Sequence, residues 1–251
     1  MKKILVVDSD ALILKFVDDV LSKQGYEVVT AGDGLSALDI LKTVTPDAVI
    51  TDLVMPNIDG RRLCKIIRGM AHLKDICLII LSAVAAEEKI DIAELDADGC
   101  IAKGPFLEMA RHLVGVLDQF DIAGSRSSLR EVIGVKDLYP RANTRELLSV
   151  KRHFEAVLEG MSEGILEITP QGRVIYANSA ACSFINVEET RLLGSHLADV
   201  FFNGVRKQVS DLIKTLDDAP IQPIQDAPME LNGRLLTFNI LHGHPCRGYC
   251  S

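Results

Sequence analysis

Hydrophobic positions in the first 120 residues alternate between short continuous runs and longer runs with helical spacing. The continuous runs are typical of buried strands and cover residues 4–7, 27–31, 48–51, 77–81 and 99–102. An amphipathic run follows each of them, which predicts helices over residues 12–21, 35–41, 60–70, 87–95 and 105–120. Five consecutive β-α units predict a doubly wound parallel α/β sheet, because each crossover must lay a helix against one of its faces.

The pattern changes near Gly124, where the small polar stretch 124–128 predicts the start of a linker. From residue 144 to about 161, nearly heptad spacing predicts a helix with a narrow stripe. The stripe consists of Leu147, Leu148, Lys151, Phe154, Val157, Leu158 and Met161. We expect a homodimer through helix 144–161, with packing of the helix on its own domain as the alternative.

A smaller α+β domain with an antiparallel sheet is predicted after Gly164. Runs 165–168 and 174–177 flank the turn-forming residues 169–172 and predict a β-hairpin. Further helices are expected over 178–185, 188–193 and 207–216, and further strands over 229–231 and 235–241. The expected domains are 1–122, a linker and signalling helix over 123–152, and 153–251, whose last strand is incomplete.

Composition narrows the class of protein. The 251 residues are 48% hydrophobic and 25% charged, which is typical of a globular protein with a proper core. The net charge of −8 comes without a basic stripe, which argues against direct binding of nucleic acid. No apolar stretch is long enough to span a bilayer, and Asp8 interrupts the short N-terminal run before it could form a secretory signal. The six cysteines are scattered and form no disulfide-like pattern, which predicts that the protein lies in a reducing cytoplasm.

Polar side chains follow four of the predicted strands at the positions where those strands end. They are Asp8 and Asp10, Asp52, Ser82 and Lys103. Because the carboxyl ends of parallel strands meet at one edge of a sheet, we expect these residues to form one site. There Asp52 would attack a phosphoryl donor and become an aspartyl phosphate. A Mg²⁺ ion held by the carboxylates would neutralise the transferring group, while Lys103 and Ser82 would contact its oxygens.

Residues 1 to about 120 resemble the receiver domain of response regulators in two-component signalling. The residues that carry the resemblance are Ile4-Leu5-Val6-Val7-Asp8, Asp52-Leu-Val-Met-Pro-Asn-Ile-Asp-Gly60, Ser82-Ala83 and Lys103. The resemblance implies a flavodoxin-like sheet with strand order 2-1-3-4-5. It also implies phosphoryl transfer to Asp52 from a histidine kinase or a phosphotransfer protein, and a main-chain carbonyl of Val54 that binds the metal. Asp59 is expected to belong to the loop and helix start.

Three positions depart from the pattern of that family. Ser9 stands where a second acid usually binds the metal, and Asp10 is the candidate to replace it. Gly104 follows Lys103 where the family usually has a proline. Cys100 stands where an aromatic residue commonly reports phosphorylation. These departures predict a weaker Mg²⁺ site and the absence of the usual aromatic switch.

Residues from about 150 to the end resemble a PAS sensor domain. The residues that carry the resemblance are 154–158, Gly164-Ile165, Gly172-Arg-Val-Ile-Tyr-Ala-Asn178-Ser-Ala-Ala181 and Leu192-Leu193-Gly194. Thr169 replaces an acidic residue that is typical of the family. The resemblance implies ligand sensing or dimerisation.

No cofactor is assigned to this second domain. Cys182 lies outside the motif of flavin-binding PAS domains and is interpreted as a small buried hydrophobe, and nothing around His196 supports a haem. Four residues near the end are close enough in sequence to suggest a metal cluster, but their spacing matches no zinc pattern. They are His242, His244, Cys246 and Cys250.

The leading interpretation is a signalling protein in which phosphorylation of Asp52 acts through the helix on the PAS domain. One alternative is a pseudo-receiver that binds partners and dimerises without phosphorylation, and another is the N-terminal part of a longer hybrid sensor kinase. A free-standing phosphoester hydrolase ranks lowest. It would need a further general acid/base, whereas Asp8 and Asp10 are needed for metal. No effector enzyme motif is found.

Overall fold

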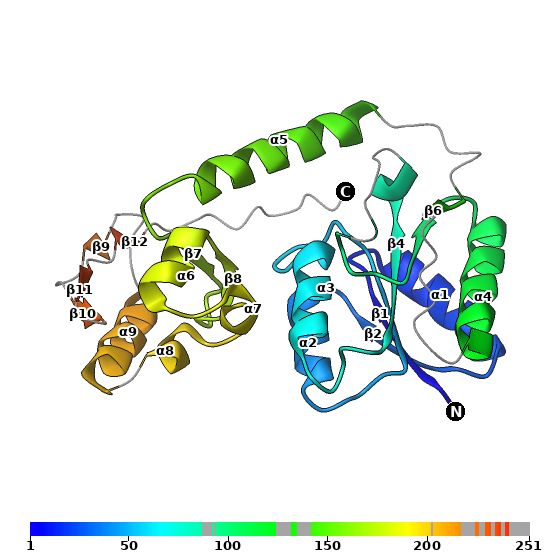
Figure 1. Cartoon of the computed structure of the whole chain (residues 1–251), viewed down its shortest axis with the longest axis horizontal. Coiled ribbons are helices and arrows are strands. Elements are labelled where there is room, and N and C mark those ends of the chain that lie inside the picture. Colours follow the sequence, from blue (N-terminus) through cyan, green and yellow to red (C-terminus); the bar gives the residue numbers. More distant parts are fainter. Residues whose placement is uncertain are drawn as a thin grey trace. The chain divides into compact units, whose positions relative to one another are not determined.

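The computed structural model of the chain describes residues 1–86, 92, 94–123, 132–134, 142–201, 203–216, 224–225, 229–231, 234–236 and 239–240. The chain divides into two units, Met1–Val157 and Leu158–Ser251. Figure 1 shows the elements of each unit. The expected domain limits at residues 122 and 152 stay predictions.

A parallel sheet forms the centre of the first unit. Its strands are β1 (Lys3–Val7), β2 (Glu27–Ala31), β3 (Ala48–Thr51), β4 (Cys77–Ser82), β5 (Gly99–Ala102) and β6 (Val132–Ile133). They lie in the order β2-β1-β3-β4-β5-β6, and every neighbouring pair is parallel. The expected order 2-1-3-4-5 is therefore confirmed. The short β6 extends the sheet beyond β5, within the range that the sequence assigned to a linker.

Helices cover both faces of this sheet, as Figure 1 shows. They are α1 (Ala11–Lys23), α2 (Gly34–Leu41), α3 (Gly60–Gly69) and α4 (Phe106–Ala123), with a 3₁₀ turn, η1 (Ala83–Ala86), after β4. Apolar residues of α1 and α4 pack with one face of β1, β3, β4 and β5. Because helices lie on both sides, β3, β4 and β5 are buried along their whole length. The helix expected over 87–95 falls largely outside the described residues.

A buried ion pair fixes the end of α3 to the sheet. The guanidinium of Arg68 donates to Asp98 Oδ2 at 2.7 Å and also to three main-chain carbonyls. The same carboxylate oxygen accepts the amide of Leu78 in β4 at 2.8 Å. Both charged side chains are almost fully buried, so each needs the other and the surrounding hydrogen bonds. The C-terminal turn of α3 is therefore tied to β4 and to the approach to β5.

A single long helix, α5 (Ala142–Glu159), follows the sheet, close to the expected range 144–161. Its described part exposes large apolar side chains at Val150, Phe154 and Val157, and Met161 beyond its end is also exposed. The side chains of residues 142–149 lie outside the described part of the structure. The helix therefore carries an apolar stripe that the described residues do not cover.

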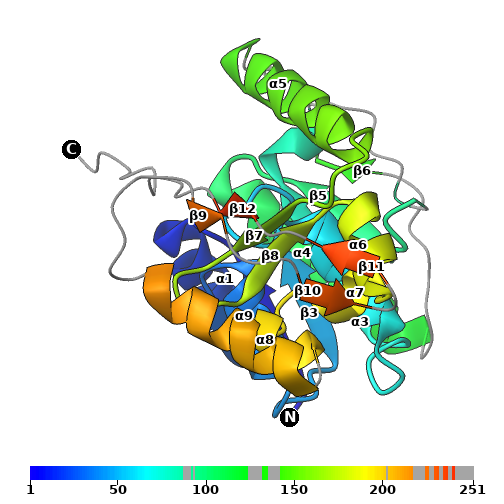
Figure 2. The same cartoon turned by 90° about the vertical axis from the view of Figure 1, so that its left-hand side faces the viewer.

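The second unit is a small α+β fold. It contains β7 (Leu166–Ile168), β8 (Val174–Ala177), α6 (Ser179–Ile185), α7 (Glu189–Leu192), α8 (Leu197–Val200), α9 (Asn203–Leu216), β9 (Ile224–Gln225), β10 (Met229–Leu231), β11 (Arg234–Leu236) and β12 (Asn239–Ile240). The expected hairpin is confirmed, because β7 and β8 pair antiparallel; Figure 2 shows the two strands. The strand expected over 235–241 is observed as two separate strands, β11 and β12, which pair with β10 and β9.

The fully buried Asn178 holds the start of this unit together. Its side-chain Nδ2 donates to the carbonyls of Leu158 and Glu163, each at 2.9 Å. Its Oδ1 accepts the amides of Ile165 at 2.8 Å and Ala181 at 2.9 Å. Every polar group of this side chain is therefore used, which offsets the cost of burying an amide. The asparagine of the PAS-like motif thus joins the end of α5 to the hairpin and to α6.

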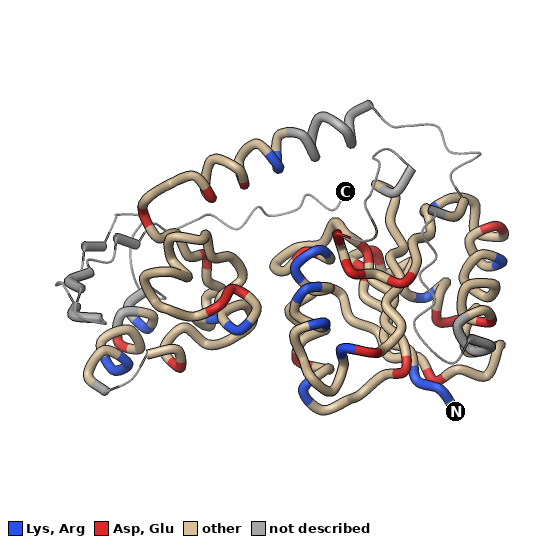
Figure 3. The backbone as a smooth tube through the Cα atoms, viewed as in Figure 1, with Lys and Arg blue, Asp and Glu red and all other residues tan. Residues whose placement is uncertain are grey.

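None of the described helices combines the length and the hydropathy that crossing a bilayer would require. The candidate metal cluster at His242, His244, Cys246 and Cys250 lies outside the described residues. Figure 3 shows that basic and acidic residues are interspersed along the described chain.

Candidate functional site

Four of the polar side chains that follow the strands meet at the carboxyl edge of the first sheet. Asp8 follows β1, Asp52 follows β3, Ser82 ends β4 and Lys103 follows β5. β1, β3, β4 and β5 are direct neighbours in the sheet, which is why residues up to 95 positions apart come together. Asp8 and Asp52 are only 2% and 7% exposed. The tertiary structure therefore assembles these four residues as the sequence predicts.

Asp52 is held at both carboxylate oxygens. Its Oδ1 accepts the hydroxyl of Ser82 at 2.6 Å and the amide of Leu53 at 2.6 Å. Its Oδ2 accepts the ammonium of Lys103 at 2.6 Å. The amide of Asp52 itself donates to the carbonyl of Val7 at 2.9 Å, which continues the β1–β3 pairing. The carboxylate is consequently kept in one orientation by a hydroxyl, a main-chain amide and a cation.

Lys103 spans the two acids. Its Nζ lies 2.6 Å from Asp52 Oδ2 and 2.6 Å from Asp8 Oδ2. Burial by itself lowers the pKa of Lys103, but the charges and hydrogen bonds of Asp52 and Asp8 outweigh burial, and the pKa is raised. Burial raises the pKa of Asp8, although its hydrogen bonds to Lys103 and the Asp10 amide act in the opposite direction. Lys103 therefore stays protonated and offers a fixed positive charge between the carboxylates.

The residues that the sequence suggests as metal ligands do not all lie in the same position relative to Lys103. Asp8 and Asp52 share the Lys103 ammonium, so their oxygens face one small region. Asp10 instead caps α1, where its side chain accepts the amide of Leu12 at 2.8 Å. Val54 lies two residues beyond Asp52 and its side chain is exposed. Within the described residues no three His, Cys, Asp or Glu side chains gather as a metal cluster.

Two carboxylates still suit a magnesium ion. Mg²⁺ is usually bound by one or two carboxylates, several waters and the phosphate of the substrate, and it prefers hard oxygen ligands. Asp8 and Asp52 supply such oxygens at the edge of the sheet, and the main chain at Val54 lies on the same loop. The donor set therefore fits the ion, although two carboxylates of this chain also hold Lys103.

The loop after Asp52 packs closely against the first turn of α3. A Cβ added at Gly60 would lie 1.9 Å from the carbonyl oxygen of Asp52, so only glycine fits there. The Gly60 amide donates to the Leu53 carbonyl at 3.1 Å. Asn57 has a positive φ of 61°, and its side chain donates to Asp33 at the start of α2. The first turn of α3 thus rests directly on the backbone of Asp52.

Asp59 is the N-cap of α3, as expected for a loop and helix-start residue. Its side chain accepts the amide of Arg62 at 3.0 Å, and the residue as a whole is buried. The sequence signal was an acid before a glycine that begins an amphipathic run. Its further contacts with α5 could not be found from the sequence, because the partners are about 90 residues away.

Cys100 packs as a hydrophobe in β5. It belongs to a buried cluster with Leu53, Ile80 and Leu95, and burial raises the pKa of its thiol to about 12. A buried, uncharged cysteine therefore occupies the position at which the family commonly has an aromatic residue. Gly104 does not prevent the preceding Lys103 from reaching both acids.

Comparison with known proteins agrees with this architecture. A family model described as "Response regulator receiver domain" matches residues 4–111, and a "PAS fold" model matches residues 152–222. "Probable transcriptional regulator ycf27" from Porphyridium aerugineum is 31% identical over 216 residues, covering 84% of this chain and 88% of the relative. "Alkaline phosphatase synthesis transcriptional regulatory protein PhoP" from Bacillus subtilis (strain 168) is 29% identical over 238 residues, covering 86% and 93%.

The solved structures that resemble the chain each cover less than half of it. The response regulator protein TrrA from Thermotoga maritima, in complex with Mg(2+)-BeF, has 32% sequence identity and a TM-score of 0.41. The similarity covers 46% of this chain and 99% of that chain.

The chain belongs to the response regulators of two-component signal transduction, with a receiver domain followed by a PAS fold. Phosphorylation of an aspartate is general in this family.

Proposed function

We propose that Asp52 accepts a phosphoryl group from a histidine kinase or a phosphotransfer protein in a Mg²⁺-dependent reaction. The observation that carries the proposal is the convergence of two groups on this carboxylate. Ser82 Oγ and Lys103 Nζ each lie 2.6 Å from one of its oxygens. A hydroxyl and an ammonium in these positions can donate hydrogen bonds to the oxygens of a phosphoryl group on Asp52. An aspartate with a purely structural role would not need a cation from a distant strand.

The reaction follows from this geometry. An Asp52 oxygen attacks phosphorus, the bond between phosphorus and the donor nitrogen breaks, and the donor imidazole leaves with the electron pair. Lys103 and Ser82 then hydrogen-bond to the phosphoryl oxygens, because these replace the carboxylate oxygen as their acceptor. Asp8, Asp52 and the Val54 carbonyl would hold Mg²⁺, with Asp10 as a further candidate. The ion, when bound, supplies positive charge to the transferring group.

Intact-protein mass spectrometry with acetyl phosphate tests the proposal. The wild type is expected to gain the mass of one phosphoryl group in the presence of Mg²⁺ and none in excess EDTA. Asp52→Ala is expected to gain nothing. No gain in the wild type, or an equal gain in Asp52→Ala, would contradict the proposal.

A pseudo-receiver is the second candidate. Ser9 provides no second acid, and Lys103 already pairs with both carboxylates of the site, so part of their charge is balanced without a metal. Such a chain would bind partners in one state only. A wild type that takes no phosphoryl group and shows no Mg²⁺ binding in a titration would favour this candidate.

The mouth of the site supports a protein as the phosphoryl donor. Leu12 at the start of α1, Val54 on the Asp52 loop and Leu107 at the start of α4 are large apolar side chains that remain exposed. All three follow strands at the same carboxyl edge as Asp52. Exposed apolar side chains around a polar site are typical of a protein docking surface.

The proposed setting of the protein is the cytoplasm, and neither nucleic acid nor a membrane is proposed as a direct partner. A longer hybrid sensor kinase, of which this chain would be the N-terminal part, stays the alternative proposal.

The PAS fold is proposed to sense a ligand of unknown identity or to dimerise, and the receiver is proposed to act on it through α5. The exposed residues Val150, Phe154, Val157 and Met161 are spaced four, three and four residues apart, which is the spacing of a two-helix seam.

We expect the wild type to be a homodimer and Phe154→Glu to be a monomer, because a charge in the seam would be buried without a partner. Light scattering coupled to size exclusion measures both, and His153→Glu, on an exposed neighbour, is the control. A monomeric wild type would contradict this.

A further inference from the structure

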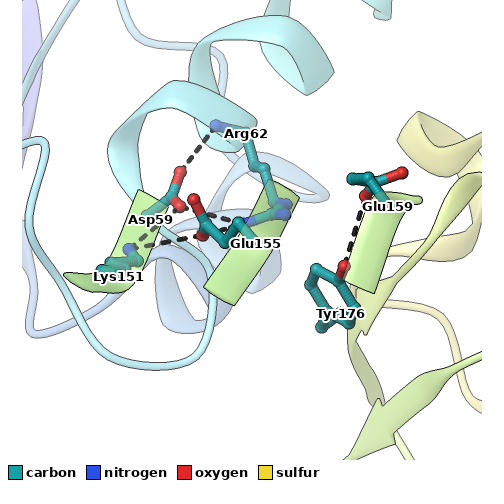
Figure 4. A network of polar contacts seen from close by, with 6 residues as sticks. All are labelled: Asp59, Arg62, Lys151, Glu155, Glu159 and Tyr176. Atoms are coloured by element: carbon teal, nitrogen blue, oxygen red, sulfur yellow. Dashed lines mark hydrogen bonds and ion pairs between the residues drawn. The ribbon is translucent and has the colours of Figure 1, made fainter. Parts of the chain in front are cut away.

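Four charged residues connect the middle of α5 with the first turn of α3. Figure 4 shows Lys151 and Glu155 of α5 facing Asp59 and Arg62 of α3. Asp59 Oδ2 lies 3.0 Å from Arg62 Nη1 and 3.3 Å from Lys151 Nζ. Arg62 Nη1 lies 3.3 Å from Glu155 Oε1, and Lys151 lies 3.8 Å from the same oxygen. Two cations and two anions alternate, so the cluster is neutral; we name it the α3–α5 clasp.

The clasp is more than a chance pair of surface charges. The side chains of Asp59 and Arg62 are 9% and 18% exposed, and the partners on α5 are 33% and 43% exposed. Isolated ion pairs on a surface contribute little, whereas a partly buried network in which each charge has two partners is less screened by solvent. Lys151 and Glu155 are four residues apart on one helix, so both reach α3 without distorting α5.

The clasp also begins next to the phosphoacceptor. Asp59 is the N-cap residue directly before Gly60, and Gly60 packs against the main-chain carbonyl of Asp52 with no space between them. A shift of the Asp52 backbone must therefore move the first turn of α3. The two bonds from Asp59 and Arg62 to α5, at 3.3 Å each, are the longest of the hydrogen bonds in the clasp.

We propose that the clasp docks α5 on α3 in the unphosphorylated chain, and that phosphorylation of Asp52 opens it. The second part rests on the proposed function. A phosphoryl group on Asp52 adds negative charge and draws Lys103 and Ser82 to new acceptors, which displaces the loop that supports Asp59. Because coupling between two sites is reciprocal, opening the clasp by mutation favours the phosphorylated state.

Charge reversal in the full chain tests both parts. Glu155→Arg places a cation against Arg62 and is expected to raise hydrogen exchange in α5 by about threefold to tenfold, as a local opening would. The same variant is expected to bind beryllofluoride with Mg²⁺, a stand-in for the phosphoryl group on Asp52, about threefold more tightly, because the coupling between the two sites is reciprocal. The double variant Arg62→Glu with Glu155→Arg, which restores opposite charges, should return both quantities towards wild type. His153→Arg, on an exposed residue of the same helix, should change neither.

The outcomes separate the two proposals. If the wild type takes no phosphoryl group, the proposed function fails, while the exchange of α5 still decides whether the clasp exists. If the wild type is phosphorylated but Glu155→Arg alters neither the affinity for beryllofluoride nor the exchange of α5, the clasp is refuted. If only the exchange changes, α5 is docked by the clasp but phosphorylation does not open it, and the proposed coupling is refuted.

Discussion

Replacing Lys103 by methionine is expected to slow phosphoryl transfer to Asp52 by about 100-fold to 1,000-fold, the usual effect of removing one preorganised group that stabilises developing charge. Lys103 Nζ lies 2.6 Å from Asp52 Oδ2 and is held there by Asp8 as well. Methionine has a similar length but no charge and no donor, so the phosphoryl oxygens lose a contact that the transition state needs. Time courses of mass gain with acetyl phosphate give the rate.

The same variant should bind Mg²⁺ more tightly, because the metal no longer competes with an ammonium for the oxygens of Asp8 and Asp52. Opposite effects on metal binding and on transfer would distinguish loss of a catalytic group from general damage to the site. Lys65→Met removes an exposed lysine of α3 and is the matched control, which we expect to behave as wild type. A Lys103→Met protein that is phosphorylated at the wild-type rate would contradict the role assigned to the ammonium.

Replacing Gly60 by alanine is expected to destabilise the first unit by about 3 kcal/mol, which is at the upper end of overpacking effects. The added Cβ would lie 1.9 Å from the Asp52 carbonyl oxygen and 2.9 Å from Leu53 Cα. Both obstacles are backbone atoms and cannot rotate away. The helix must therefore move, which strains the Gly60–Leu53 hydrogen bond and displaces the N-cap at Asp59.

The other end of the same helix provides the control. A Cβ added at Gly69 meets nothing within 4 Å, so Gly69→Ala should raise stability by about 0.5 to 1 kcal/mol through its smaller loss of backbone entropy. Hydrogen exchange of the β4 amides at increasing urea reports unfolding of the first unit. Equal stabilities of the two alanine variants would show that the loop after Asp52 is not packed as described.

These experiments concern features that the sequence revealed to different extents. The sequence predicts the apolar runs of β3, β4 and β5 because helices on both faces bury these strands completely, and complete burial leaves a continuous run. The convergence of Asp8, Asp52, Ser82 and Lys103 followed from the same topology. The two-residue strand β6 was not predicted, since so short a segment has no periodicity.

For the site, the sequence likewise identified residues, whereas the fold showed their contacts. The sequence named Asp10 as a possible metal ligand, but only the fold shows that its carboxylate caps α1. It marked Gly60 as the start of a helix, whereas its contact with the Asp52 carbonyl depends on how α3 meets β3. It placed Lys151 in an apolar stripe, and the structure pairs that ammonium with Asp59.

The sequence by itself determined the parallel sheet, the family and the candidate phosphoacceptor Asp52, because hydrophobic periodicity, motif residues and the residues at strand ends are local features of the chain. The tertiary structure alone decided that Lys103 spans both carboxylates, that Gly60 touches the backbone of Asp52 and that Lys151 and Glu155 of α5 contact Asp59 and Arg62 of α3. The reason is physical. Each of these contacts joins side chains or backbone from different elements, and its geometry depends on how those elements pack.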